Sequence, residues 1–225
     1  MAVIYISGID TGIGKSVATG LLGRQLLLAG KNVITQKLVQ TGCGKISGDI
    51  LIHRLLMGMA WNRFDDGGIT CPYTFPFPAS PHLAAELAGE MIRPQVLAEN
   101  TSRLARSHEV VLVEGAGGLM VPLTREMTLL DYLEQQRARL LLVSSSRLGS
   151  INHTLLSLSA LAKRRLELLG LIYNIDHNTP PEITADSREI IASRLHILFP
   201  AAVILDMWKE TDGSFRLAAR ELPLL

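Results

Sequence analysis

Apolar residues along this chain occur in short continuous runs that alternate with longer segments of helical spacing. The strands that these runs predict, rich in leucine and β-branched residues, occupy residues 2–6, 33–37, 109–114, 140–143, 168–175 and 202–205, and several of them end in polar residues. Between them, segments such as 17–28, 151–162 and 187–195 repeat apolar residues every three or four positions, which predicts helices. Strands that are apolar on both sides and alternate with helices are typical of a parallel sheet covered on both faces. The pattern therefore predicts a three-layer α/β protein, with a parallel sheet between two layers of helices.

One irregular segment interrupts this alternation at residues 60–80. Prolines and a Gly-Gly pair exclude any long helix or strand there. Such a segment inside a compact domain is usually a binding loop or disordered, and the aromatic residues between Tyr73 and Phe77 favour an ordered lid. Pro81 and Pro94 follow it, at positions that suit the first turns of the next helices.

A glycine-rich turn joins the first strand to the first helix, with the sequence Gly8-Ile9-Asp10-Thr11-Gly12-Ile13-Gly14-Lys15-Ser16. In a phosphate-binding loop, glycines let consecutive backbone N–H groups converge on phosphate oxygens, and the helix N-terminus adds positive potential. The lysine neutralises the terminal phosphates and the hydroxyl binds Mg²⁺. Five residues separate Gly8 from Gly14, where the common pattern has four. The turn therefore predicts a phosphate loop one residue longer than usual.

Two other interpretations of this turn stand beside that one. The first is an ordinary strand-to-helix connection in which Lys15 is a solvated helix residue. The second is a dinucleotide-binding turn, but Gly8, Gly12 and Gly14 do not follow the G-x-G-x-x-G order. Strand, turn and helix come in the order that a phosphate loop needs, so we favour the phosphate loop.

Glycines inside the first predicted helix indicate close packing. Gly20 and Gly23 lie within its helical pattern, and each costs about 1 kcal/mol relative to alanine. We therefore expect another segment of backbone to pack closely against this helix.

Polar residues follow several predicted strands at the point where each strand ends. Lys37 closes the second strand, Glu114 the third and Asn174 a later one. Because the carboxyl ends of parallel strands share one edge, where ligands bind, these residues mark a candidate site. Lys37 is suited to stabilising charge on a transferring phosphoryl group, and Glu114 to binding Mg²⁺. The alternatives are that Lys37 extends into solvent and that Glu114 caps the next turn.

Other polar residues have two interpretations each. Asp49 begins a predicted helix after the polar loop 41–48, where it either contacts Mg²⁺ or caps the helix. His82 and His153 stand beside predicted helix starts, and for both a structural histidine is favoured over a catalytic base.

Composition limits the class of protein. The 225 residues are 48% hydrophobic and 19% charged, which suits a single domain over residues 1–225. The formal net charge of +1 argues against a nucleic-acid surface. Cys43 and Cys71 have no metal-ligand spacing and suit a reducing compartment. Without an apolar run long enough for a membrane span, we expect a soluble cytoplasmic protein that binds neither nucleic acid nor membrane.

Six blocks of sequence are more specific than the phosphate loop alone. They are residues 8–16, 37–42, 71–75, 80–82, 113–118 and 148–153, which read GIDTGIGKS, KLVQTG, CPYTF, SPH, VEGAGG and LGSINH. In this order, and over nearly the whole chain up to Asn174, they resemble the dethiobiotin synthetase family, whose loop is also longer. The resemblance implies a P-loop NTPase-like fold and a single ATP-dependent ligase domain.

The resemblance also implies a reaction in biotin biosynthesis that uses ATP and Mg²⁺. In that family, 7,8-diaminopelargonate takes up CO₂ as a carbamate, and the carbamate attacks the γ-phosphate of ATP to give a carbamic-phosphoric anhydride. The second amine then closes the ureido ring of dethiobiotin as phosphate leaves. The implied partners are the diamino acid, CO₂ and ATP, together with a second copy of the chain in a homodimer.

Carried over by motif, the resemblance implies a set of site residues. The candidate catalytic residues, at the phosphates and the carbamate, are Thr11, Lys15 and Lys37. The candidate Mg²⁺ ligands are Ser16, Asp49 and Glu114. Further nucleotide contacts are Gly12, Ile13, Gly14, Val17, Gly115, Ala116, Gly117 and Asn174, the last at the adenine edge. The candidate substrate contacts are Thr41 at the diamine and, across the dimer interface, the helix start Gly149, Ser150, Ile151 and Asn152 at the carboxylate.

Two other functions are compatible with the sequence. One is a nucleotide switch related to the partitioning and septum-positioning ATPases, which share this sheet but carry an additional early lysine where this chain has Asp10. The other is a nucleotide-binding paralogue with a shifted substrate or base preference. Residues 203–208 favour this second alternative because they lack the Gly-x-Ile-Pro-like turn usual in the family.

Overall fold

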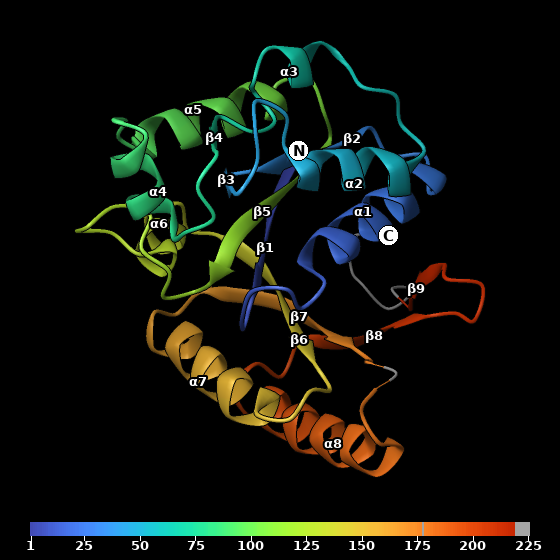
Figure 1. The fold of residues 1–225 in the computed structure, drawn as a ribbon. Helices are drawn as coiled ribbons and strands as arrows, with labels where there is room; N and C mark the ends of the chain where they lie inside the picture. Colours follow the sequence, from blue (N-terminus) through green and yellow to red (C-terminus); the bar gives the residue numbers. More distant parts are fainter. Residues whose placement is uncertain (177, 219–225) are drawn as a thin grey trace.

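The computed structural model describes residues 1–176 and 178–218. Seven strands form one sheet in the order β2-β5-β1-β6-β7-β8-β9 (Figure 1). The strands are β1 Ala2–Gly8, β2 Val33–Lys37, β5 Val110–Gly118, β6 Arg139–Ser145, β7 Glu167–Asn174, β8 Val203–Lys209 and β9 Phe215–Leu217. Neighbours are parallel except for β8 and β9, which are antiparallel. The predicted three-layer α/β fold is confirmed, with an antiparallel edge that the apolar pattern did not predict.

Helices cover both faces of this sheet. They are α1 Lys15–Leu28, α2 Gly48–Met57, α3 Arg63–Asp66, α4 Pro81–Leu87, α5 Pro94–Ala105, α6 Leu129–Gln135, α7 Ser150–Lys163 and α8 Pro181–Leu198. Along β1, Ile4 and Ile6 pack in the core under α1, whereas Tyr5 packs in the core under α5 to α8. Successive side chains of a strand point to opposite faces, so a strand covered on both sides must be apolar throughout.

Two glycines of α1 lie against α2, which runs beside it in Figure 1. A Cβ added at Gly20 would lie 2.8 Å from the Leu56 Cβ, and one at Gly23 would lie 2.8 Å from the Met57 sulfur. Real Cβ atoms do not approach other atoms so closely, so Gly20 needs to be glycine, whereas at Gly23 the flexible Met57 side chain would have to move. The predicted close packing is confirmed, and the neighbour is helix α2.

Several element boundaries differ from the prediction. Strand β5 continues four residues past Glu114, so that this carboxylate lies within the strand, paired with Lys37 at the end of β2. Helix α8 begins at Pro181, earlier than its apolar spacing indicated, because proline suits a first helical turn. Strand β8 extends to Lys209, where it turns into the hairpin with β9.

Residues 60–80 are ordered, as expected, and contain α3 and the short strand β4 (Tyr73–Phe75). Strand β4 pairs in parallel with β3 (Val39–Thr41), which follows Lys37 almost directly. Pro81 and Pro94 open α4 and α5, which confirms the predicted first-turn positions. None of the helices within the described ranges is long and apolar enough to cross a membrane.

Candidate nucleotide site

The phosphate loop lies between β1 and α1, at the carboxyl edge of the sheet. Gly12 and Gly14 have φ values of 69° and 93°, a left-handed backbone region that favours glycine. A Cβ on Gly14 would also lie 2.7 Å from the Asn174 amide nitrogen. These glycines therefore shape the turn that presents Lys15 and Ser16 at the first turn of α1.

The side chain of Lys15, at the end of the phosphate loop, is buried. Its ammonium donates a hydrogen bond of 2.6 Å to the backbone oxygen of Asp10. Burial and the nearby charge of Lys37 lower the pKa of Lys15 to about 8. Its hydrogen bond is to a backbone oxygen and not to a carboxylate. An anionic ligand such as a nucleotide phosphate would therefore stabilise its buried positive charge.

A cluster of charged side chains lies next to this loop. The Lys37 ammonium is 2.7 Å from the Glu114 Oε1 and 2.7 Å from the Asp49 Oδ2, and it donates to the Gly115 carbonyl at 3.0 Å. The Ser16 hydroxyl donates to the same Oε1 of Glu114 at 3.0 Å. The cluster thus joins β2, α2, β5 and the start of α1 at one point.

Opposite charges decide the protonation of this cluster. Burial alone would lower the pKa of Lys37, but the carboxylates of Glu114 and Asp49 outweigh burial and hold that pKa above its ordinary value. For Glu114, burial would raise the pKa, but Lys37 and His53 hold it well below its usual range. The cluster is therefore a charged one at neutral pH.

The geometry excludes the exposed and capping positions that were the alternatives drawn from the sequence. Lys37 is 5% exposed, so it does not extend into solvent, and Glu114 is held by Lys37 and Ser16 rather than capping a turn. Asp49 does not cap α2 because the Ser47 hydroxyl fills that position and accepts from the Ile50 N–H at 3.2 Å. The Asp49 carboxylate faces Lys37 instead.

Most of the predicted site residues, including the substrate contact Thr41, line one cavity of about 710 Å³. Those that line it are Thr11, Gly12, Gly14, Lys15, Ser16, Val17, Lys37, Thr41, Asp49, Glu114, Ala116 and Gly117. Residues 78–81, at the end of the irregular segment, also line it. That contact places the predicted lid beside the phosphate loop.

Asn174 lies on the other side of the loop, in a second cavity of about 380 Å³ that also reaches Gly12 and Ile13. Its amide donates a hydrogen bond of 2.9 Å to the Ile13 carbonyl. The far wall of this second cavity includes Lys209 and Phe215 of the β8–β9 hairpin. The hairpin therefore forms part of the cavity wall beside Asn174.

The predicted carboxylate-binding helix start is not brought into either cavity. Gly149 precedes the first turn of α7 with φ 90°, and none of the residues 149–152 lines the cavities around the phosphate loop. Leu148 beside it is 91% exposed. Within one chain, the structure therefore leaves this helix start apart from the site.

His53 belongs to the charged cluster but was not predicted from the sequence. His53 is fully buried in α2, and its Nε2 lies 2.7 Å from the Glu114 Oε2. It follows Asp49 by four residues, so both side chains lie on the same face of the helix. That spacing is the signal that the sequence offered.

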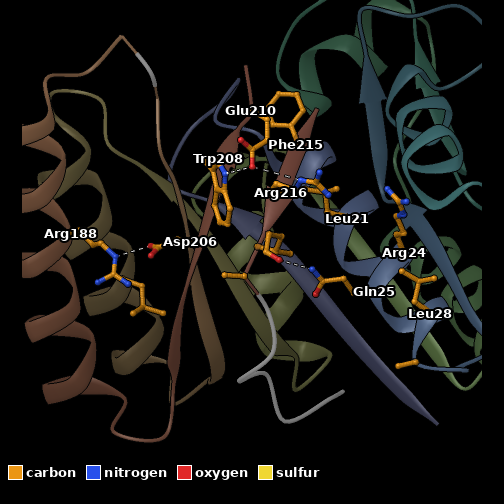
Figure 2. Close-up of a pocket in the computed structure, with 14 residues that line it drawn as sticks. Leu21, Arg24, Gln25, Leu28, Arg188, Asp206, Trp208, Glu210, Phe215 and Arg216 are labelled. Carbon is orange, nitrogen blue, oxygen red and sulfur yellow. Dashed lines mark hydrogen bonds and ion pairs between the residues drawn. The ribbon is translucent and has the colours of Figure 1, made fainter. Parts of the chain in front are cut away.

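A third, larger hollow of about 1400 Å³ lies between α1 and the β8–β9 hairpin, and none of the predicted site residues lines it. Figure 2 shows two contacts between polar groups of this hollow: Arg188 pairs with Asp206 at 2.7 Å, and Gln25 donates to the Leu217 carbonyl at 2.6 Å. These groups are satisfied without a ligand, so size alone does not make this hollow a site.

Comparisons with known proteins agree with this geometry. A family model described as an AAA domain matches residues 2–204. The chain is 49% identical over 206 residues to the "ATP-dependent dethiobiotin synthetase BioD" of Chlorobaculum tepidum, covering 91% of this chain and 86% of the relative. It is 50% identical over 172 residues to the "ATP-dependent dethiobiotin synthetase BioD 2" of Haemophilus ducreyi, covering 76% of this chain and 82% of that relative.

Among solved structures, the chain is similar to the MinC:MinD cell division protein complex of Aquifex aeolicus, with a TM-score of 0.53 at 14% identity. The match covers 94% of this chain and 83% of that one. At such low identity the likeness concerns the fold alone, which is P-loop NTPase-like.

Proposed function

This chain belongs to the family of ATP-dependent dethiobiotin synthetases, and we propose that residues 1–225 act as one ligase domain that closes the ureido ring of dethiobiotin from 7,8-diaminopelargonate, CO₂ and ATP. The observation that carries the proposal is the position of Lys37. Its ammonium is buried between two carboxylates at the wall of the cavity beside the phosphate loop. A cation there faces the place where phosphoryl transfer needs one.

Magnesium fits the oxygen atoms of this cluster. Within the described residues, no group of three or more His, Cys, Asp or Glu would hold a metal by itself. Mg²⁺ bound to a nucleotide, however, needs only one or two carboxylates besides phosphates and water. We assign this position to Ser16, Asp49 and Glu114, of which Ser16 and Glu114 already contact one another. The ion would neutralise phosphate charge there.

The chain's own residues then divide the work of the reaction. The phosphate loop binds the triphosphate through its backbone N–H groups and Lys15, with Gly115, Ala116 and Gly117 beside it. Lys37 and Thr11 hold the γ-phosphate next to the substrate carbamate. A carbamate oxygen attacks the phosphorus as ADP leaves, and the second amine then attacks the carbamate carbon as phosphate leaves. Positioning and charge stabilisation are the main contributions that this site makes.

We further propose that the diamine lies along Thr41 and that its carboxylate is held by the partner subunit in a homodimer. Support comes from the start of α7, at Gly149, Ser150, Ile151 and Asn152, which lines neither cavity of its own chain although a helix N-terminus suits an anion. Cys43 and Cys71 are free thiols, and this supports a cytoplasmic location for the protein.

The test is product formation by the purified protein. Incubation with the diamine, bicarbonate and Mg-ATP should give dethiobiotin together with equal amounts of ADP and phosphate, detected by mass spectrometry. Repeating it with CTP, GTP and UTP measures the base preference of the second cavity. Tight ATP binding without product would favour the paralogue with another substrate.

A further inference from the structure

His53 holds the one oxygen of Glu114 that the phosphate loop leaves free. Ser16 and Lys37 both donate to Oε1, at 3.0 and 2.7 Å, whereas His53 Nε2 lies 2.7 Å from Oε2. The side chains of His53 and Glu114 are 0% and 1% exposed. Both oxygens of this carboxylate are therefore fixed by protein groups from three different elements.

The other ring nitrogen shows which atom carries the proton. Among the described residues, His53 Nδ1 is buried without a hydrogen-bond partner. A proton on Nδ1 would leave an N–H group unpaired in the core and turn the Nε2 lone pair toward a carboxylate oxygen, and both are unfavourable. With the proton on Nε2, the imidazole donates to Glu114 and only one lone pair stays unsatisfied. His53 is thus a hydrogen-bond donor to Glu114.

The backbone at His53 lies close against helix α1. Gly20 of α1 lies against α2 so closely that an added Cβ would be 3.4 Å from the His53 Cα. Asp49, one turn earlier on the same face, pairs with Lys37. Helix α2 therefore brings a carboxylate and an imidazole to the cluster as one rigid unit.

We propose that His53 is a positioning residue that holds the Glu114 carboxylate by its Oε2, so that Oε1 stays directed at Ser16 and the metal of the nucleotide. The inference rests on the metal site of the proposed function. Residues that orient a metal ligand change metal affinity by about 10–100-fold when they are replaced. A histidine that only filled space in the core would have no such effect.

A matched pair of amide variants separates the two cases. In His53→Gln the side-chain nitrogen reaches the place of Nε2 and can still donate to Glu114, whereas in His53→Asn it reaches only the place of Nδ1. The measurement is Mn²⁺ affinity in the presence of ADP, from the electron paramagnetic resonance signal of free Mn²⁺. We expect His53→Asn to bind Mn²⁺ about 10-fold more weakly and His53→Gln to stay close to the wild type.

Two controls make the result decisive. Met57→Ala removes a buried side chain one turn further along α2 and should lower the melting temperature without changing Mn²⁺ affinity. Equal Mn²⁺ affinities of the Gln and Asn variants would overturn the inference, as would a Met57→Ala effect as large as that of Asn. If the wild type itself binds no Mn²⁺ with ADP, the proposed metal site fails first, and the inference falls with it.

Discussion

At one end of the candidate nucleotide site, the buried side chains of Lys37 and His53 both contact Glu114 through charged or strongly polar atoms. At the other end, Asn174 is half-buried and donates one neutral hydrogen bond to Ile13. Hydrogen bonds between charged groups are about twice as strong as neutral ones, and a dry surrounding strengthens them further. The first end is thus suited to holding a charge, and the second to contacting a neutral group.

This difference predicts where substitutions act. Contacts that matter mainly in the transition state change kcat, whereas contacts made equally with the bound substrate change KM. We expect the charged end to control turnover and metal binding, and the Asn174 end to control nucleotide affinity.

The largest effect should come from Lys37→Ala. Removing a preorganised cation from the reacting phosphate should lower kcat by about 10²–10³-fold while nucleotide affinity changes little. Steady-state kinetics and calorimetric ATP binding measure the two quantities. The control is Lys31→Ala. Lys31 precedes the first residue of β2, at the opposite end of the strand from Lys37, and its variant should keep full activity. Unchanged kcat in Lys37→Ala would remove this lysine from the mechanism.

The second effect concerns a buried ion pair of helix α2, the helix that carries Asp49 and His53. Arg54 of α2 pairs with Asp65 at 2.7 Å, and both side chains are buried. Burial would raise the pKa of Asp65, but hydrogen bonds from Arg54 and Thr70 outweigh it and hold the pKa below its ordinary value. This stabilisation is present above the unfolded pKa of about 3.9 and is lost as pH falls through the lower folded pKa.

Asp65→Asn should therefore lower the free energy of unfolding by about 3 kcal/mol at pH 7, because it leaves a buried guanidinium unpaired. The difference from the wild type should shrink below about pH 4. Urea denaturation of both proteins at pH 7 and at a pH below about 4 measures this difference in the free energy of unfolding. Asp66→Asn, at the exposed neighbour, is the control and should stay close to the wild type. A gap that does not change with pH would contradict the assignment to Asp65.

The third effect belongs to the other end of the site. Asn174→Ala removes the hydrogen bond to Ile13 and a polar wall of the second cavity, so KM for ATP should rise about 10-fold while kcat stays near the wild type. The same kinetic assay as for Lys37→Ala gives both values. A decrease in kcat with an unchanged KM would contradict the expectation that the Asn174 end controls nucleotide affinity.

The smallest effect should come from Arg147→Ala. Its contact with Asp10 is 3.8 Å long and both side chains are largely exposed, so the pair contributes well under 1 kcal/mol. Nucleotide affinity should change by no more than about 2-fold. A larger change, measured at low and high salt, would show that charge also contributes at this end.

The sequence allowed the charged end to be predicted in large part. Lys37 and Glu114 were recognisable because each closes a predicted buried strand, and strand ends of a parallel sheet meet at one edge. The phosphate loop was recognisable from Gly12, Gly14 and Lys15 between a strand and a helix. These features depend on local pattern and on a topology that the pattern itself indicates.

Other features depend on how elements pack, which no local pattern contains. His53 was missed because a histidine four residues after Asp49 gains its meaning only when the fold brings α2 beside Glu114 of β5. The antiparallel hairpin of β8 and β9 was missed because the apolar run ends at Leu205 while the strand continues to Lys209. The wall of the second cavity therefore could not be derived from the sequence.

The contact between Gly20 and α2 has a consequence for protein engineering. Replacing a glycine in a helix by alanine is a standard route to higher thermal stability, since it favours the helix by about 1 kcal/mol. Here the new methyl group would collide with Leu56 and push outward the helix that carries Asp49 and His53. Because such a collision also destabilises the folded protein, Gly20→Ala is expected to lower both the melting temperature and the activity, and the general rule fails at this position.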